Sequence, residues 1–440
     1  MQSRISQVRM MKTSFKKTIY HFLLAVIVFI PFQSLAVAIL GNISNLPAAE
    51  VFWLAHWYEP VSLLLLPAII LSRIVKGNIS RDRLWLMAIG LIAFGFVTII
   101  TGDLPVGRML EGFRFTLFPI LIFLLASSRV FRSWEKRTFV TTYLVLALLI
   151  AILAVVERFL PPHYLEFLGI LPQGSLFGFG NFTIVEVYQS SSLIGAPNQL
   201  ATYLLPALFL FLIKAKRGEM SRLCAVPAST IIALAILFTF SRSALIGAVF
   251  ALLVSAMLYF RDRYWSMTIA SSLPFFVLIP YLVYIRSGGM WWDLFTHGAS
   301  QTQHAGALEQ SLTELGSRLS QPGTLFFGSG LGSAGPLVLK YGDGLVSESW
   351  YLQLFLELGL IGFMLWFFLI IAMCKRLIDG SGDSEKPMLA LGLIAVLVAA
   401  LFLHTLSDNP AVSITLFILI GVYATEDAQI ARAAQSGARE

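Results

Sequence analysis

The feature that most constrains the fold of this chain is a succession of apolar runs, each close to the length of a bilayer span. A membrane helix needs about 20 apolar residues, and a backbone in lipid must satisfy its own hydrogen bonds, as a helix does. Only 12% of the 440 residues are charged, against roughly 25% in a soluble domain. We therefore predict an all-α polytopic membrane protein with about twelve transmembrane helices, near residues 19–40, 54–74, 84–102, 107–127, 138–160, 198–214, 224–240, 242–260, 265–285, 349–374, 387–405 and 409–424.

The Lys and Arg residues of the connections predict the orientation, because basic connections stay in the cytoplasm. With the amino terminus in the cytoplasm, most of the 31 Lys and Arg residues fall on the cytoplasmic side. The exceptions are Arg108, Arg114, Arg158, Arg242, Arg286, Arg318 and Lys340. We predict one integral-membrane helical domain over residues 1–425, a short cytoplasmic tail over 426–440, and both termini in the cytoplasm. This topology explains the net charge of +7 without a nucleic-acid partner.

Two long connections are left on the outer side, at residues 161–198 and 286–348. In the second, leucines at helical spacing predict a short amphipathic helix that ends at Gln321-Pro322-Gly323; they are Leu308, Leu312, Leu315 and Leu319. The glycine-rich run from Gly328 to Gly332 predicts a tight turn. It resembles a phosphate cradle only weakly, because it follows no βαβ unit and lacks the P-loop lysine.

No residue cluster predicts a metal site or a cofactor. His297 and His304 lack metal-ligand spacing, and Cys224 and Cys374 lie in or beside apolar runs.

Arg242 is the most informative single residue. The segment Thr239–Ala244 joins two spans with almost no loop, so that Ser241 can cap the second helix and Arg242 lies in its first turn. The helix dipole disfavours a cation there, and an arginine at this depth usually faces a partner or a cavity. Helix amino termini and guanidinium groups both bind phosphate oxygens. We predict an anion site; the alternative is a snorkelling arginine or a pair with Glu111 or Asp408.

Glu348 is the second candidate. Ser347 is a candidate helix cap, which puts Glu348 in the first turn of the tenth span, as an ordinary capping carboxylate or as a general base for a hydroxyl group. Arg286 and Arg318 lie on the same outer side and can add to an anion site, or serve as an interfacial residue and a helix-terminal cation. Glu357 is half a turn out of phase with Glu348, and we predict that it is buried and structural.

These motifs, taken in order, resemble the O-antigen ligase and Wzy-type polysaccharide polymerase superfamily. The resemblance rests on Ser241-Arg242, on the glycine-rich outer run, and on Glu348–Gly362, with Gly195-Ala196-Pro197-Asn198 similar to a further signature. It implies a C-type glycosyltransferase fold in the bacterial inner membrane, with large periplasmic loops at 161–198 and 286–348, the latter between helices 9 and 10. It also implies an undecaprenyl-pyrophosphate-linked glycan as donor, used at the periplasmic face without a metal or cofactor.

The resemblance further implies roles for the outer residues. Arg242 and Arg318, with Arg286, would bind the donor pyrophosphate, and Arg242 and Glu348 would be catalytic. Glu348 falls where the ligases carry a histidine, which favours a polymerase of O-antigen, capsule or exopolysaccharide over a ligase that loads lipid A core or protein. A second departure is Gln189, near the place where many members carry an arginine. Expected partners are the glycan donor, membrane lipid, a flippase and a chain-length regulator.

A twelve-helix transporter is the alternative from another class. The basic signature of major-facilitator proteins between spans two and three is missing, and the long connection lies on the outer side between spans nine and ten. Both features favour an enzyme over a transporter.

Overall fold

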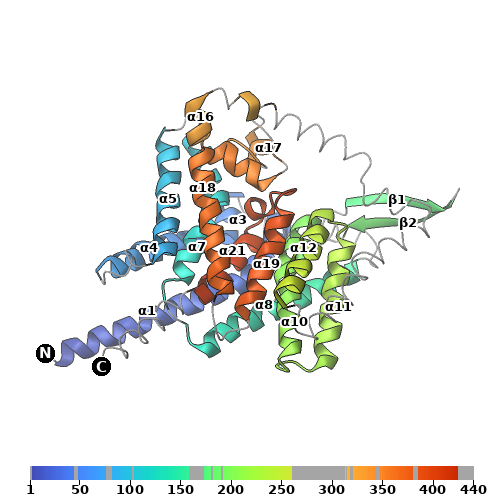
Figure 1. Ribbon diagram of the computed structural model, residues 1–440, viewed down its shortest axis with the longest axis horizontal. Coiled ribbons are helices and arrows are strands. Elements are labelled where there is room, and N and C mark those ends of the chain that lie inside the picture. The colour runs from blue at the N-terminus through green and yellow to red at the C-terminus, as the bar shows by residue number, and fades with distance from the viewer. Residues whose placement is uncertain are drawn as a thin grey trace.

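Helices dominate the computed structural model of the chain (Figure 1). The structure describes residues 2–43, 48–75, 82–101, 104–129, 131–157, 173–179, 182–189, 192–259, 313, 315–317, 321–335, 337–341, 347, 349–379 and 385–424. Up to the hairpin the elements are α1 (Gln2–Phe29), η1 (Ile30–Phe32), α2 (Gln33–Ile43), α3 (Ala48–Ala55), α4 (Tyr58–Val75), α5 (Arg83–Thr101), α6 (Val106–Thr116), α7 (Phe118–Ala126) and α8 (Ser133–Glu157). After strands β1 (Gln173–Phe179) and β2 (Phe182–Gln189) come η2 (Ser192–Ile194), α10 (Pro197–Lys216), α11 (Arg222–Phe238), α12 (Arg242–Tyr259), α16 (Pro322–Phe327), α17 (Leu337–Tyr341), α18 (Trp350–Ile378), α19 (Glu385–Ala399), α20 (Thr405–Asp408) and α21 (Pro410–Ala424).

Six helices are long and apolar enough to cross a membrane, and a seventh span results if the bent pair α6 and α7 counts as one. Parts of α11, α12 and α21 form shorter apolar helices. Every predicted span coincides with a helix except 265–285, which lies outside the described residues. The chain is therefore a helical membrane protein.

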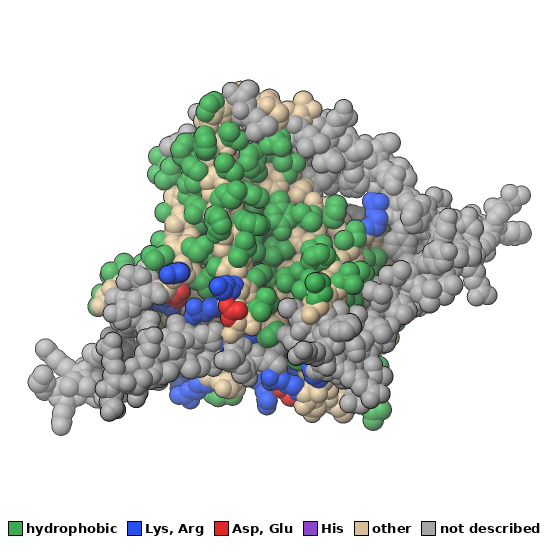
Figure 2. Space-filling view, in the orientation of Figure 1, with side chains coloured by type: hydrophobic (Ala, Val, Ile, Leu, Met, Phe, Trp, Pro, Cys, Tyr) green, Lys and Arg blue, Asp and Glu red, His purple; other side chains and the backbone are tan. Residues whose placement is uncertain are grey.

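Helices that are apolar on every side form the centre of the bundle. All of α7 and nearly all of α21 are buried, and the two pack against each other. In the same way α10 and α19 are largely buried and pack together, and α12 lies against α19. A helix that is hydrophobic all round belongs inside a protein. Apolar side chains also cover the exterior over the middle of the molecule, and most visible Lys and Arg side chains lie below them (Figure 2).

Glycines let these central helices approach closely. A Cβ atom on Gly392 of α19 would lie 2.8 Å from Pro206 Cα of α10. A Cβ atom on Gly247 of α12 would overlap the Ala395 carbonyl of α19. Small residues at such crossings are typical of membrane helices, which associate through close packing and not through the hydrophobic effect.

Two of the predicted spans are broken, which the apolar pattern does not indicate. The span predicted at 107–127 bends by 45° between α6 and α7, where Pro119 lies in the first turn of α7. The span predicted at 349–374 is kinked within α18, because Gly359 has φ 65° and ψ −171°. Proline removes a backbone donor, and glycine alone tolerates this backbone conformation at little cost, so both breaks have a local cause.

The outer connection at 161–198 contains a hairpin that hydropathy does not reveal. Strands β1 and β2 pair antiparallel, with Gln173 opposite Gln189 and an irregularity between Phe177 and Gly178. The β-branched and aromatic residues from Phe182 to Tyr188 are typical of a strand.

Most of the amphipathic helix predicted over Leu308–Leu319 lies outside the described residues. The four residues of this segment that the structure describes, 313 and 315–317, are helical. The predicted stop at Gln321–Gly323 is where a new helix, α16, begins with Pro322 in its first turn. Proline is favoured at that position because the first helical N–H has no partner within the helix.

Connections that the charge pattern predicts to be cytoplasmic meet at one end of the bundle. Arg73 donates to the Ser127 carbonyl at 2.7 Å, which joins the connection after α4 to the one after α7. Lys136 of α8 lies over the ring of Tyr423, 5.2 Å from its centroid. We call this region the basic end; it comprises residues 73–75, 82, 127–129, 131–136, 214–219, 376–379, 385–386 and 423–424.

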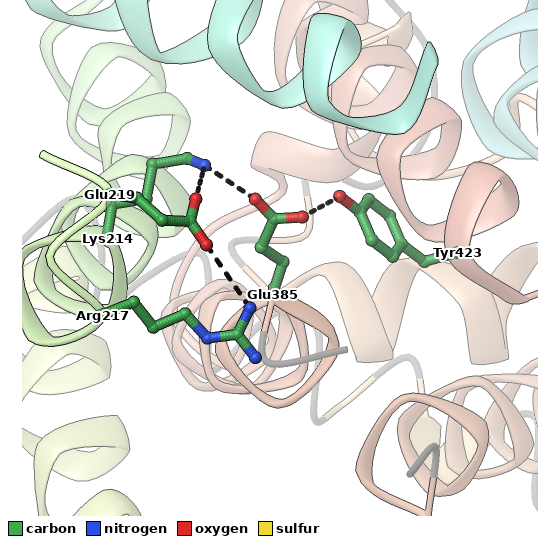
Figure 3. A network of polar contacts seen from close by, with 5 residues as sticks. All are labelled: Lys214, Arg217, Glu219, Glu385 and Tyr423. Carbon is green, nitrogen blue, oxygen red and sulfur yellow. Dashed lines mark hydrogen bonds and ion pairs between the residues drawn. The ribbon is translucent and has the colours of Figure 1, made fainter. Parts of the chain in front are cut away.

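A charge network in which Lys214 and Glu385 are buried and Arg217 and Glu219 are exposed forms the centre of the basic end (Figure 3). Lys214 Nζ lies 2.8 Å from Glu385 Oε1 and 3.0 Å from Glu219 Oε2, and the Tyr423 hydroxyl donates to Glu385. Arg217 adds an ion pair to Glu219. Burial alone would raise the pKa of Glu219, but the hydrogen bond and charge of Lys214 outweigh it and hold that pKa below its usual value. The network ties the ends of α10, α19 and α21 together.

Candidate functional site

The turn that carries Arg242 is built by local hydrogen bonds. Thr239 Oγ1 donates to the Ile236 carbonyl at 2.6 Å and accepts from the Ser241 N–H at 3.2 Å, and Phe240 adopts φ 53°. The Ser241 carbonyl accepts from the Leu245 N–H at 3.1 Å, as the carbonyl of an N-cap residue does.

This geometry confirms that the Ser-Arg motif opens a helix. Arg242 is the first residue of α12 and is partly exposed. Of its two suggested partners, Glu111 pairs instead with Lys340.

The first turns of α12 lie against the last turns of α19. Gly247, five residues after Arg242, packs on the backbone of Ala395 and Ala399. Only a glycine allows this approach, because any Cβ atom there would overlap the Ala395 carbonyl. The start of α12 is thereby held beside the carboxyl end of α19.

The start of α18 reaches the same end of α19. The Trp350 N–H lies 3.1 Å from the Ala400 carbonyl and 3.2 Å from the Leu403 carbonyl. Two helices from distant parts of the sequence, α12 through Gly247 and α18 through Trp350, therefore contact residues Ala395–His404, which we call the α19 end.

The structure corrects the predicted cap of α18. The helix begins at Trp350, with Ser349 as the extended N-cap residue and no side-chain cap, so Ser347 is not the cap. Ser347 is fully buried, and its hydroxyl donates to the Ser349 carbonyl at 2.8 Å. Glu348 consequently precedes the helix and does not belong to its first turn. The physical reason is that the α19 end binds the Trp350 N–H, and Ser349 before it is extended.

The Gly195–Asn198 signature also lies at a helix start, as predicted. Helix α10 begins at Pro197, after Gly195 with φ 97°. Asn409 joins this region to α21: its Nδ2 donates to the Ile194 carbonyl at 3.0 Å and to Gln199 Oε1 at 2.6 Å. Its Oδ1 accepts from the N–H of Ala411 at 2.8 Å, which caps α21.

The glycine-rich run forms a tight turn against the kink of α18, which confirms that prediction. The Ser329 and Gly330 N–H groups donate to the Leu356 and Glu357 carbonyls, at 2.9 and 3.1 Å. Both carbonyls lie within three residues of the break in the helix at Gly359. Gly328 has φ 76°, and a Cβ atom on it would overlap the α18 backbone. Glycine is therefore required at Gly328 in the turn and at Gly359 in α18.

The glycine-rich turn also binds a carboxylate of the protein itself, that of Glu357. Glu357 is 1% exposed, which confirms its predicted burial. It accepts from Thr116 Oγ1 at 2.9 Å, from Gln353 Nε2 at 3.2 Å and from the Gly332 N–H at 3.2 Å. Arg108 Nε holds the other side of the turn by donating to the Gly332 carbonyl at 2.8 Å. A nest of backbone N–H groups can bind an anion, but Glu357 already occupies this one, so it is not a phosphate cradle.

A small cavity lies beside these groups, between Arg114, Phe118 and Ser407. It holds about 10 Å³, no more than one water molecule. Arg114 forms an ion pair with Glu59. This cavity is too small to hold a substrate.

A larger groove of about 440 Å³ runs along α18, over Phe367, Ile371 and Cys374 and up to Leu397 of α19. It lies on the apolar exterior. Its lining is mainly apolar, which suits a hydrocarbon chain of the surrounding lipid, and Lys375 and Asp379 also line it.

Sequence analysis missed the polar residues that connect these elements. His404 Nδ1 lies 3.1 Å from the Ser347 carbonyl, and Ser407 Oγ donates to Gln353 Oε1 at 2.7 Å. The signal that could have found them is the short polar stretch His404–Asn409 between two apolar runs. Polar residues that interrupt apolar helices usually have a specific partner.

Arg242 is the one predicted site residue within the described part of the chain. Arg286, Arg318 and Glu348 lie outside it, as do His297 and His304. The structure places α12, which opens with Arg242, and Trp350 of α18 against the same segment, the α19 end. Among the described residues, no group of three or more His, Cys, Asp and Glu side chains could hold a metal ion.

Comparison with known proteins adds no further assignment. No protein-family model matches the chain, and no curated protein sequence matches it.

Proposed function

We propose that the chain is a bacterial inner-membrane polysaccharide polymerase for O-antigen, capsule or exopolysaccharide. It would transfer an undecaprenyl-pyrophosphate-linked glycan to an acceptor sugar hydroxyl. One observation supports the proposal: α12, which opens with Arg242, and the start of α18 both contact the α19 end. These are the two places where the resembled superfamily carries its anion-binding and catalytic residues.

The proposed topology has twelve spans in a C-type glycosyltransferase fold, with both termini in the cytoplasm. The basic end would face the cytoplasm, because basic connections are retained there. Helix α19 begins in the basic end at Glu385, so its carboxyl end would face the periplasm. The loop at 286–348, between spans nine and ten, would lie on that side, where the lipid-linked glycan is presented.

In the proposed reaction the acceptor hydroxyl oxygen attacks the anomeric carbon of the donor glycan. The bond from that carbon to the pyrophosphate oxygen breaks as the new glycosidic bond forms. The hydroxyl proton passes to the carboxylate of Glu348, and undecaprenyl pyrophosphate leaves with the electron pair. Arg242, with Arg318 and Arg286, would stabilise the charge that grows on the leaving group.

Arginine suits this role better than lysine would. Its planar guanidinium group donates two parallel hydrogen bonds to phosphate oxygens, whereas lysine acts as a point charge. Removing one preorganised donor from a transition-state anion site typically costs about 10²–10³ in rate.

The test replaces the native gene with variants in the organism that carries it and measures polysaccharide chain length on gels. Arg242→Ala and Arg242→Lys should both shorten the polymer severely, and Glu348→Gln should do the same. The matched control is Arg132→Ala at an exposed position of the basic end, which should leave chain length unchanged. Full-length polymer from the Arg242→Ala variant would refute the anion site, and from Glu348→Gln the base.

Labelled donor glycan separates the related functions. A polymerase lengthens the undecaprenyl-linked chain, whereas a ligase moves label to lipid A core or to protein. A transporter would change where the labelled glycan is found without forming a new glycosidic bond.

A further inference from the structure

Two buried hydroxyl groups at the centre of the bundle have no hydrogen-bond partner among the described residues. They belong to Tyr203 of α10 and Thr415 of α21, and each residue is 2% exposed. Buried hydroxyl groups are normally hydrogen-bonded, because burial without a partner costs the free energy of the lost bonds to water. These two groups therefore need an explanation.

Both residues line the same cavity, which lies where α8, α10, α19 and α21 meet. Every residue that lines this cavity is buried. The cavity holds about 10 Å³, which is room for one water molecule and for nothing larger. The cavity is thus an internal site of the bundle and has no contact with the lipid-facing exterior.

Pro206 adds a third polar group to this site. Proline has no N–H, so the carbonyl of Thr202, four residues earlier in α10, receives no hydrogen bond from position 206. Thr202 and Pro206 both line the cavity. In membrane helices, a carbonyl freed by proline is bonded instead by a neighbouring side chain or by an ordered water molecule.

The neighbouring side chains do not supply that bond. The Tyr143 hydroxyl donates to the Tyr203 carbonyl at 2.6 Å, and a hydroxyl group has only one hydrogen to donate. The Thr202 hydroxyl is bonded to the Asn198 carbonyl at 2.7 Å. The hydroxyl groups of Tyr203 and Thr415 form no bond to it either. The other lining residues, on α19 and α21, have apolar side chains.

We propose that this cavity is a binding site for a single water molecule. The water donates one hydrogen to the Thr202 carbonyl and one to the Thr415 hydroxyl, and it accepts from the Tyr203 hydroxyl. Three hydrogen bonds are the usual number for a buried water. An ion does not suit the site, because no lining residue is charged and its charge would be uncompensated. The water joins α10 to α21 where Pro206 interrupts the hydrogen bonds of α10.

The first measurement uses substitutions that remove one hydroxyl each, Tyr203→Phe and Thr415→Val, in the full chain in detergent. With the water bound, each variant loses one hydrogen bond, and we expect the unfolded-to-folded ratio to rise about fivefold. In a dry cavity each substitution removes a buried hydroxyl without a partner, so the ratio falls. The control is Tyr341→Phe at an exposed position of α17, which should change the ratio by less than about twofold. A ratio that falls in either test variant would overturn the proposal.

The variant that carries both substitutions tests whether the two hydroxyl groups share one ligand. Groups that bond to the same water are coupled, so the second substitution costs less once the first has been made. We expect the combined effect to be at least about twofold smaller than the product of the two single effects. An effect equal to that product would show two independent groups and would overturn the shared water.

The last measurement detects the water in the unmodified chain, whether or not the variants fold. A brief X-ray pulse converts water, including bound water, to hydroxyl radicals, which oxidise the nearest side chains, and mass spectrometry locates the oxidised residues. We expect oxidation of Tyr203 despite its burial, at a higher rate than that of Phe123 of α7, which is 0% exposed and does not line this cavity. Oxidation of Tyr203 no faster than that of Phe123 would mean that the cavity is dry.

Discussion

The basic end and the α19 end are bonded to other segments in different ways. At the basic end the cations meet carboxylates, as Lys214 meets Glu385 and Glu219. At the α19 end the bonds to neighbouring segments end on backbone carbonyls, those of Ala400 and Leu403 for the Trp350 N–H and that of Ser347 for His404. The first arrangement neutralises charge and fastens helix ends together. The second sets the position of main chain, which is what a reaction site needs.

The carboxylates show the same difference. Glu385 has a cation and a phenol as partners, whereas Glu357 is held by a hydroxyl, an amide and a backbone N–H. Backbone and neutral donors can stabilise an ionised carboxylate without a cation. The comparison therefore predicts that substitutions at the basic end change stability, while substitutions at the α19 end change geometry and activity.

The largest expected effect on stability is at Glu385. Glu385→Gln leaves Lys214 buried without this partner, and breaking a buried ion pair costs roughly 3–5 kcal/mol. Unfolding in detergent should report this loss, while glycan elongation per folded molecule stays unchanged. Double-mutant analysis with Lys214→Met should recover part of the loss, because no unpaired charge is left. A loss of glycan elongation without a loss of stability would contradict the expectation that the basic end contributes to stability and not to activity.

A glycine substitution at the kink of α18 should have the second-largest effect on stability. Gly359→Ala puts a Cβ atom 2.5 Å from the Phe326 backbone at a residue with φ 65°. We expect a cost of about 3 kcal/mol from backbone strain and overlap. Limited proteolysis should detect detachment of the glycine-rich turn. Gly90→Ala, in α5 with nothing near its Cβ position, is the control and should not destabilise the protein.

Glu357→Gln should have a smaller effect on stability. The amide keeps one acceptor oxygen but turns an N–H₂ group toward a donor, and such a mismatch costs about 1–3 kcal/mol. Hydrogen exchange of the Gly332 amide should accelerate, and elongation should fall with it. Unchanged exchange would mean that the glycine-rich turn is held without this carboxylate.

The smallest expected effect is a pH dependence at the basic end. Glu219 has a pKa below its usual value of about 4.5, so its ion pairs stabilise the folded state fully above that value. This stability is lost as the pH falls through the lower, folded-state pKa. Because Glu219 is largely exposed, the effect should not exceed about 1 kcal/mol. The stability of the Glu219→Gln variant, measured over the same acid range, should lack this pH-dependent part. If the variant and the unmodified protein show the same dependence of stability on pH, the ion pairs of Glu219 are not its source.

The positions of the helices follow from the sequence, and so does the grouping of the basic connections. Apolar runs become helices because a lipid-exposed backbone has no other way to satisfy its hydrogen bonds. The start of α12 at Arg242 could be predicted as well, because Ser241 is a local helix signal. The tight glycine-rich turn could also be predicted from the sequence.

The sequence by itself determined which segments form apolar helices, where Arg242 opens a helix, and that Glu357 is buried. Only the tertiary structure decided what these residues meet. The glycine-rich turn binds Glu357, Ser347 is held by His404, and α18 begins at Trp350 because the α19 end takes its N–H. Hydropathy and helix signals are local properties of a segment. Hydrogen bonds between distant segments depend on how the helices pack, and no single segment contains that information.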